Sequence, residues 1–116
     1  DMFRHVNNAR YLEFLEEGRW AFFDANPGFF YRLKGVTFFV VNININYRRP
    51  SSLGDVLDIQ TRLSKIGNTS GVLRQEIFEK GTGGLIADAD VTFVIADAKT
   101  QKPLNLKDQL KNTIVS

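Results

Sequence analysis

The sequence contains no cysteine and a single histidine, His5. The absence of cysteine excludes disulfide bonds, cysteine-bound zinc, iron–sulfur clusters and a thiol nucleophile. A lone histidine excludes sites that need two, such as the H-E-x-x-H motif of zinc proteases. Because disulfide-free chains suit a reducing compartment, we expect a cytoplasmic protein.

The sequence also lacks long apolar runs and long runs of one charge. No stretch approaches the roughly 18 apolar residues needed to cross a bilayer, and no secretory signal pattern opens the chain. Fifteen basic and thirteen acidic residues give a formal net charge of +2, without the basic stripe typical of nucleic-acid binding. We therefore expect neither a membrane nor a nucleic acid as partner.

The length of 116 residues fits one domain spanning 1–116. Internal repeats, linkers and low-complexity tracts, which would indicate further domains, are absent. The sequence opens with Asp1 and not with methionine, so we expect a native N-terminal segment, and any strand in it, to be missing.

A long amphipathic helix is predicted over residues 8–25. Large apolar residues recur at steps of three and four, which places them on one helix face. That face comprises Tyr11, Phe14, Leu15, Gly18 and Phe22, and is widened by Leu12 and Phe23. The other side carries acidic residues and Arg19. Asn7 or Asn8 is the expected N-cap, and Asn26-Pro27-Gly28 ends the helix.

Four strands are predicted after the helix, because apolar and polar residues alternate there. Their ranges are 36–48, 56–66, 72–80 and 85–96. In the first of them, Ile43, Ile45 and Tyr47 alternate with asparagines, which indicates one buried and one polar face. Short connections require antiparallel pairing, so we expect the strands to form a four-stranded meander.

These elements predict an α+β fold in which a curved antiparallel sheet wraps around one long central helix. Gly18 costs about 1 kcal/mol relative to alanine in a helix, so we expect the sheet to approach the helix closely there. A short final helix, which could cover the outer face of the sheet, is indicated by Leu106, Leu110 and Ile114 behind the possible cap Asn105. Because exposed strand edges are usually paired, we expect a second copy to close the structure.

The most informative segment is 1–17, which reads DMFRHVNNARYLEFLEE. It resembles the start of the hydroxybenzoyl-CoA thioesterase-like family of hotdog-fold acyl-CoA thioesterases. In that family an aspartate and a short turn precede a His-Val-Asn-Asn-Ala-x-Tyr-type entry into a helix with acidic residues. Tyr47-Arg48-Arg49-Pro50, followed by Leu53-Gly54-Asp55, also resembles the second strand and turn of the family. The resemblance covers the whole chain in element order and implies the hotdog fold.

The resemblance assigns roles to two groups. The catalytic aspartate of the family matches Asp1, which would attack a thioester carbonyl or activate a water. The backbone amide at the helix start matches Asn8, where the positive end of the helix dipole would polarise that carbonyl. This chemistry requires no metal or redox cofactor. Arg4 departs from the family pattern, because many relatives have glycine in this turn.

Other candidate residues each have two interpretations. His5 orders the loop through hydrogen bonds or acts as a base. Glu13 and Glu17 belong to a solvated helix face, or one of them is a reserve carboxylate, since other hotdog thioesterases carry theirs on the central helix. Arg48 and Arg49 could bind CoA phosphates through their guanidinium forks, although neighbouring strand positions face opposite ways.

We therefore predict an acyl-CoA thioesterase that releases a carboxylic acid and free CoA. It would work as a homodimer or homotetramer with a CoA site between subunits. Six phenylalanines form the core or line an acyl pocket, namely Phe22, Phe23, Phe29, Phe30, Phe38 and Phe39. Two alternatives stay open: a hotdog hydratase or dehydratase that uses Asp1 with His5, and a non-catalytic acyl-CoA-binding module, suggested by Arg4.

Overall fold

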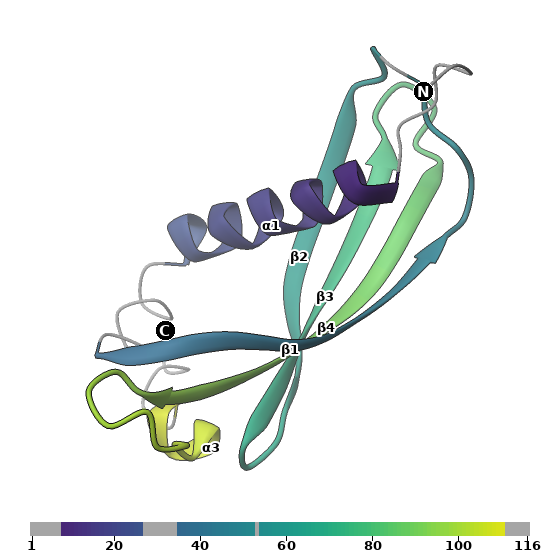
Figure 1. Cartoon of the computed structure of the whole chain (residues 1–116). Helices are drawn as coiled ribbons and strands as arrows, with labels where there is room; N and C mark the ends of the chain where they lie inside the picture. The colour runs from purple at the N-terminus through teal and green to yellow at the C-terminus, as the bar shows by residue number, and fades with distance from the viewer. Residues whose placement is uncertain (1–7, 27–34, 53, 111–116) are drawn as a thin grey trace.

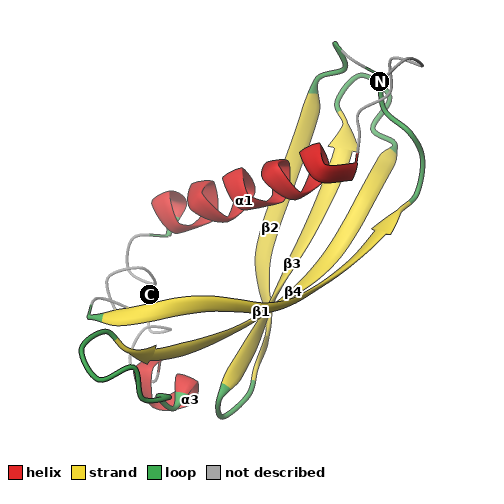
Figure 2. Cartoon of the chain, in the orientation of Figure 1, coloured by secondary structure: helices red, strands yellow, loops and turns green. Residues whose placement is uncertain are grey.

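Residues 8–26, 35–52 and 54–110 are described by the computed structural model of the chain (Figure 1). Along the sequence it contains α1 (Asn8–Ala25), β1 (Val36–Tyr47), β2 (Leu57–Ile66), β3 (Ser70–Glu79), β4 (Leu85–Asp97) and α3 (Leu106–Leu110). One antiparallel sheet holds all four strands, and α1 lies across one face of it (Figure 2). The predicted helix and strands are confirmed, with strand ends shifted by one or two residues.

The strand order is β1-β4-β3-β2, which corrects the predicted meander. β2, β3 and β4 do pair in sequence order, but β1 lies beside β4. The short-loop rule does not apply to the connection from β1 to β2, because residues 48–56 supply nine residues. Nine residues can span about 30 Å, and crossing three strand spacings requires only about 14 Å. β1 and β2 are therefore the two edges of the described sheet.

The alternation in the strands sorts their side chains as predicted. The buried residues of β3 and β4 include Leu73, Ile77, Ala87, Ala89, Val91, Phe93 and Ile95, which form one core with Tyr11, Leu15 and Phe23 of α1. The asparagines of β1 are exposed on the opposite face. The apolar stripe of α1 is narrower than predicted, because Leu12 points about 100° further round the helix than Tyr11 and is 42% exposed.

Helix and sheet approach each other most closely at Gly18, as the sequence predicts. A methyl group at Gly18 would stand 2.6 Å from Cγ2 of Ile59. Beside this contact the fully buried Gln75 donates from Nε2 to the Leu15 carbonyl at 2.9 Å and to Oγ1 of Thr61 at 3.0 Å. Its Oε1 accepts from Arg19 at 3.1 Å, so Arg19 bonds to the sheet and does not lie on the solvated side of the helix. One buried amide group thus joins α1, β2 and β3.

Nearby asparagine side chains set the end of α1 and the start of α3. The Asn26 side chain donates to the Phe22 carbonyl at 2.9 Å and ends α1. At α3 the predicted cap is confirmed, since the Asp108 amide donates to Oδ1 of Asn105 at 3.0 Å.

The position of α3 follows from its contact with β3 and β4. A methyl group at Gly71 would meet both Phe93 and Leu106, which places α3 on the same face as α1. The expectation that α3 covers the outer face is therefore wrong, because its apolar residues complete the core.

Part of the phenylalanine cluster forms the core. Phe38 stacks on Phe93 with ring centroids 4.5 Å apart, and Phe23 meets Phe38 edge-on at 5.4 Å. Phe39 is 40% exposed on β1. Phe29 and Phe30 lie outside the described residues, as do Pro27, Gly28 and Ile114.

Replacing Gly18 by alanine tests the close approach. Although alanine favours a helix by about 1 kcal/mol, we expect Gly18→Ala to lower the free energy of unfolding by about 1–3 kcal/mol, because overpacking displaces Ile59. Chemical denaturation measures the change. Combining it with Ile59→Ala, which removes the opposing methyl, should make the alanine at position 18 less costly than in the wild-type background. A stabilised Gly18→Ala protein would contradict the packing described.

Candidate active site

The start of α1 is the described part of the predicted catalytic site. The helix begins at Asn8, and its first turn contains no acidic residue. The amides of a first turn have no carbonyl partner within the helix, and they form the positive end of the helix dipole. Asp1 and His5 lie outside the described residues, as does the possible cap Asn7. The described residues thus supply an electropositive amide group but not its predicted carboxylate.

The reserve carboxylates are on the solvent side of the helix. Glu13 and Glu17 are exposed, with 59% and 64% of their side chains accessible. Arg10 forms an ion pair with Glu13 and approaches Glu17 to 3.9 Å. These contacts fit the solvated-face interpretation of both glutamates.

Tyr11 connects the first turns of α1 to the segment after β1. Its hydroxyl oxygen lies 2.7 Å from Oγ of Ser51 and accepts the Ser51 amide proton at 3.2 Å. Both residues are buried, with 3% and 2% of their surface exposed. The Tyr11 ring also packs against Tyr47 at 5.5 Å and against Phe14 at 6.2 Å. The helix start is therefore fixed to the chain immediately after the edge strand.

Arg48 and Arg49 connect that same segment to β4 and to the turn between β3 and β4. Arg48 donates from its backbone to Ile86 at 2.7 Å, and its guanidinium contacts both carboxylate oxygens of Asp88, at 2.6 and 3.2 Å. Arg49 donates to Oγ1 of Thr82 at 2.9 Å and lies 3.8 Å from Glu79. About half of each arginine side chain stays exposed.

Asp88 lies among several hydrogen-bond donors and positive charges. Asp88 is almost completely buried, and it also accepts from Asn46 at 3.2 Å and lies 3.4 Å from Arg74. The hydrogen bond from Arg48 is the main cause that holds the pKa of Asp88 below its usual range, against the opposing effect of burial. The same pair raises the pKa of Arg48. Hydrogen bonds from Thr82 lower the pKa of Glu79 in the neighbouring turn.

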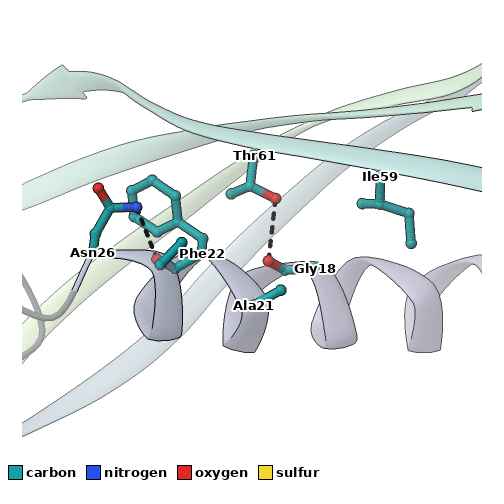
Figure 3. Close-up of a pocket in the computed structure, with 7 residues that line it drawn as sticks. Gly18, Ala21, Phe22, Asn26, Ile59 and Thr61 are labelled. Carbon is teal, nitrogen blue, oxygen red and sulfur yellow. Dashed lines mark hydrogen bonds between the residues drawn. The ribbon is translucent and has the colours of Figure 1, made fainter.

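A hollow of about 230 Å³ lies between the second half of α1 and β2 (Figure 3). Thr61 and Ile59 of β2 point from the strand towards the helix, and Thr61 donates to the Gly18 carbonyl at 3.4 Å. The remaining lining comes from Gly18, Ala21, Phe22, Ala25 and Asn26. Phe22 is the member of the phenylalanine cluster that borders it, and the small residues of α1 leave the space open.

Within residues 8–26, 35–52 and 54–110, no group of three or more histidine, cysteine, aspartate or glutamate side chains could hold a metal ion. Among the described helices, none is long and apolar enough to span a membrane.

Residues 1–114 match the family model of the Thioesterase-like superfamily. The chain belongs to this superfamily. It is 47% identical over 115 residues to the long-chain acyl-CoA thioesterase FadM of Escherichia coli K12. This alignment covers 98% of this chain and 87% of FadM. It is also 30% identical over 105 residues to YneP of Bacillus subtilis 168, a putative acyl-CoA thioesterase, covering 88% of this chain and 75% of YneP.

A solved structure agrees with this membership. The crystal structure of YbaW, a probable thioesterase from Escherichia coli, aligns with a TM-score of 0.85 and 45% identity over 100% of this chain and 90% of that one. The resemblance seen in segment 1–17, and the hotdog fold that it implies, are thereby confirmed. The candidate site of this thioesterase-family chain is the positive start of its central helix.

Sequence reasoning missed three polar groups that connect the helix of this thioesterase-family chain to its sheet. Tyr11 is recognised only as part of the apolar face, and neither Ser51 nor Gln75 is singled out. A signal does exist for Gln75, since it occupies an inward position in the alternation of β3. A buried polar residue at such a position requires hydrogen-bond partners.

Because the pKa of Asp88 is lowered in the folded protein, the free energy of unfolding depends on pH. A carboxylate with a depressed pKa stabilises the fold above its ordinary pKa of about 3.9 and loses this contribution as the pH falls through its native value. We expect Asp88→Asn to cost about 1 kcal/mol at pH 7, because the half-exposed Arg48 is partly screened by solvent. Its deficit relative to wild type should shrink below about pH 4.

Urea denaturation at several pH values measures this difference. Asp90→Asn is the matched control, because Asp90 lies on the same face of β4 and contacts Arg74 at 3.4 Å but is exposed. An Asp88→Asn deficit that is constant from pH 3 to pH 7 would show that the charge of Asp88 does not contribute.

Proposed function

We propose that this chain hydrolyses acyl-CoA thioesters to a carboxylic acid and free CoA. The observation that carries the proposal is the 47% identity with a long-chain acyl-CoA thioesterase over almost the entire chain. The start of α1 supports it, because an electropositive helix terminus matches the charge that develops on a thioester carbonyl during attack. We propose long-chain acyl groups as the substrate class.

In the proposed reaction the Asn8 amide donates a hydrogen bond to the carbonyl oxygen of the thioester. Asp1 removes a proton from a water, whose oxygen bonds to the carbonyl carbon, or attacks that carbon itself to form an anhydride that water then hydrolyses. The C–S bond breaks, and the sulfur of CoA takes a proton as it leaves. His5 orders the loop that carries Asp1, and Glu13 and Glu17 are the reserve carboxylates.

Arg48 and Arg49 are the proposed contacts for the phosphates of CoA. Their guanidinium groups are held in place by Asp88, Thr82 and Glu79 and keep about half of their surface accessible. A preoriented guanidinium loses little conformational freedom when it binds a phosphate. This favours a CoA site close to segment 48–52, which Tyr11 connects to the helix start.

The edge of β1 supports the proposed homodimer or dimer of dimers. β1 is 12 residues long, contains neither proline nor lysine, and exposes Phe39, Val40 and Val41. Native proteins usually protect an edge of this kind by pairing or covering it. We propose that a second copy pairs along β1 and that the assembled enzyme works in the cytoplasm.

The mechanism is tested by comparing the rates of acyl-CoA hydrolysis by the full-length wild-type protein and by its Asp1→Asn variant. We expect free CoA to appear from long-chain acyl-CoA substrates, and Asp1→Asn to lower kcat by at least about 100-fold, the usual contribution of a general base. Thiol release is followed with a chromogenic thiol reagent. Glu13→Gln and Glu17→Gln test the reserve carboxylates, and we expect both variants to keep activity near that of wild type.

Equal rates for wild type and Asp1→Asn would remove Asp1 from the mechanism. Hydration of an enoyl-CoA without thiol release would identify a hydratase. Tight CoA binding without turnover of any thioester would identify a binding module.

A charge on the β1 edge tests the assembly. We expect Val41→Lys to shift the protein towards the monomer, because each pairing edge would then carry an added positive charge in place of an apolar side chain. Val56→Lys is the control, since Val56 is 60% exposed but precedes β2. Light scattering after size exclusion gives the mass, and an unchanged assembly for Val41→Lys would argue against pairing along β1.

A further inference from the structure

We propose that Tyr11 and Ser51 are positioning residues, whose hydrogen bond sets where the Asn8 amide stands relative to the bound thioester. This inference rests on the proposed function. It assigns a part in the reaction to two buried hydroxyl groups, one of them on a residue that the sequence analysis places only on the apolar face of the helix.

The geometry gives the pair direct control over the start of the helix. Tyr11 follows Asn8 by three residues, about 4.5 Å along the helix axis. Its hydroxyl lies 2.7 Å from Oγ of Ser51 and accepts the Ser51 amide proton at 3.2 Å. Two hydrogen bonds to one residue restrict both the position and the direction of the Tyr11 side chain.

Ser51 is itself part of a segment whose neighbouring arginines bond to β4 and to the turn between β3 and β4. Arg48 bonds to Asp88 on β4, and Arg49 bonds to Thr82 in the turn between β3 and β4. A continuous path of contacts therefore runs from the helix start through Tyr11 and Ser51 to β4. The same path fixes the Asn8 amide relative to the two arginines that are proposed to hold CoA.

Packing alone does not account for a hydroxyl at this position. The ring of Tyr11 contacts Tyr47 and Phe14, and phenylalanine would make the same ring contacts. The hydroxyl adds a directional restraint near the group that must meet the carbonyl oxygen. Misplacing such a group by about 1 Å can cost about 100-fold in rate, so a small shift of the helix start affects catalysis more than binding.

The test measures kcat, KM and thermal unfolding for Tyr11→Phe, Ser51→Ala and the double variant with one long-chain acyl-CoA. We expect Tyr11→Phe to lower kcat about tenfold, with KM changed less than about twofold. Tyr11→Phe removes both hydrogen bonds to Ser51, and Ser51→Ala removes only the one to Oγ. The double variant should therefore be no slower than Tyr11→Phe, because that single variant has already lost the bond that Ser51→Ala removes. Ser51→Ala keeps the experiment informative if Tyr11→Phe does not fold.

Tyr47→Phe is the matched control. It removes the same atom from a ring that touches Tyr11, but 43% of Tyr47 is exposed. We expect its kcat to stay within about twofold of wild type. A purely structural role for Tyr11 would lower the unfolding temperature and leave kcat unchanged at a temperature where all variants are folded.

Two outcomes would overturn the inference in distinguishable ways. An active wild-type enzyme whose kcat is unchanged in Tyr11→Phe and in Ser51→Ala would overturn the positioning role alone. Multiplicative losses in the double variant would show that the two hydroxyls act independently and would also overturn it. A wild-type protein that releases no thiol would overturn the proposed function, and the positioning role with it.

Discussion

The contact of α1 with the sheet at Gly18 is the constraint on which the rest of the structure depends. With no side chain at this position, the helix lies so close to Ile59 that a single methyl group would not fit. At this separation Gln75 can reach the Leu15 carbonyl and hold helix and sheet through one amide group. A helix held at its middle has little freedom to slide along the sheet, so its two ends keep fixed positions.

The start of that helix is then fixed a second time by polar contacts. Tyr11 bonds to Ser51, and Arg48 in the same segment bonds to the buried Asp88. Breaking such a pair leaves a buried polar group without a partner, which is costly. The network therefore favours the arrangement that keeps these bonds over other positions of the helix start. This explains how a small sheet with two edges can hold an electropositive helix terminus in the place where it is proposed to act on a substrate carbonyl.

The sequence predicts the fold well where local rules decide. Alternation identifies the faces of the strands, and Gly18 indicates the close approach, because both signals depend on neighbouring residues alone. The position of β1 beside β4 is not predictable in this way, since the long connection from β1 to β2 permits several topologies. The partners of Tyr11 and Gln75 are equally hidden, because Ser51 and Leu15 lie 40 and 60 residues away in the chain. The catalytic role of Asp1 comes from a motif and stays a prediction.

A crystal structure of the full-length protein with an unreactive acyl-CoA analogue tests the central claim most directly. The account predicts the carbonyl oxygen of the analogue within hydrogen-bond distance of the Asn8 amide, with the Asp1 carboxylate facing the carbonyl carbon. A carbonyl bound far from the start of α1 in every subunit, with another carboxylate beside it, would contradict the account.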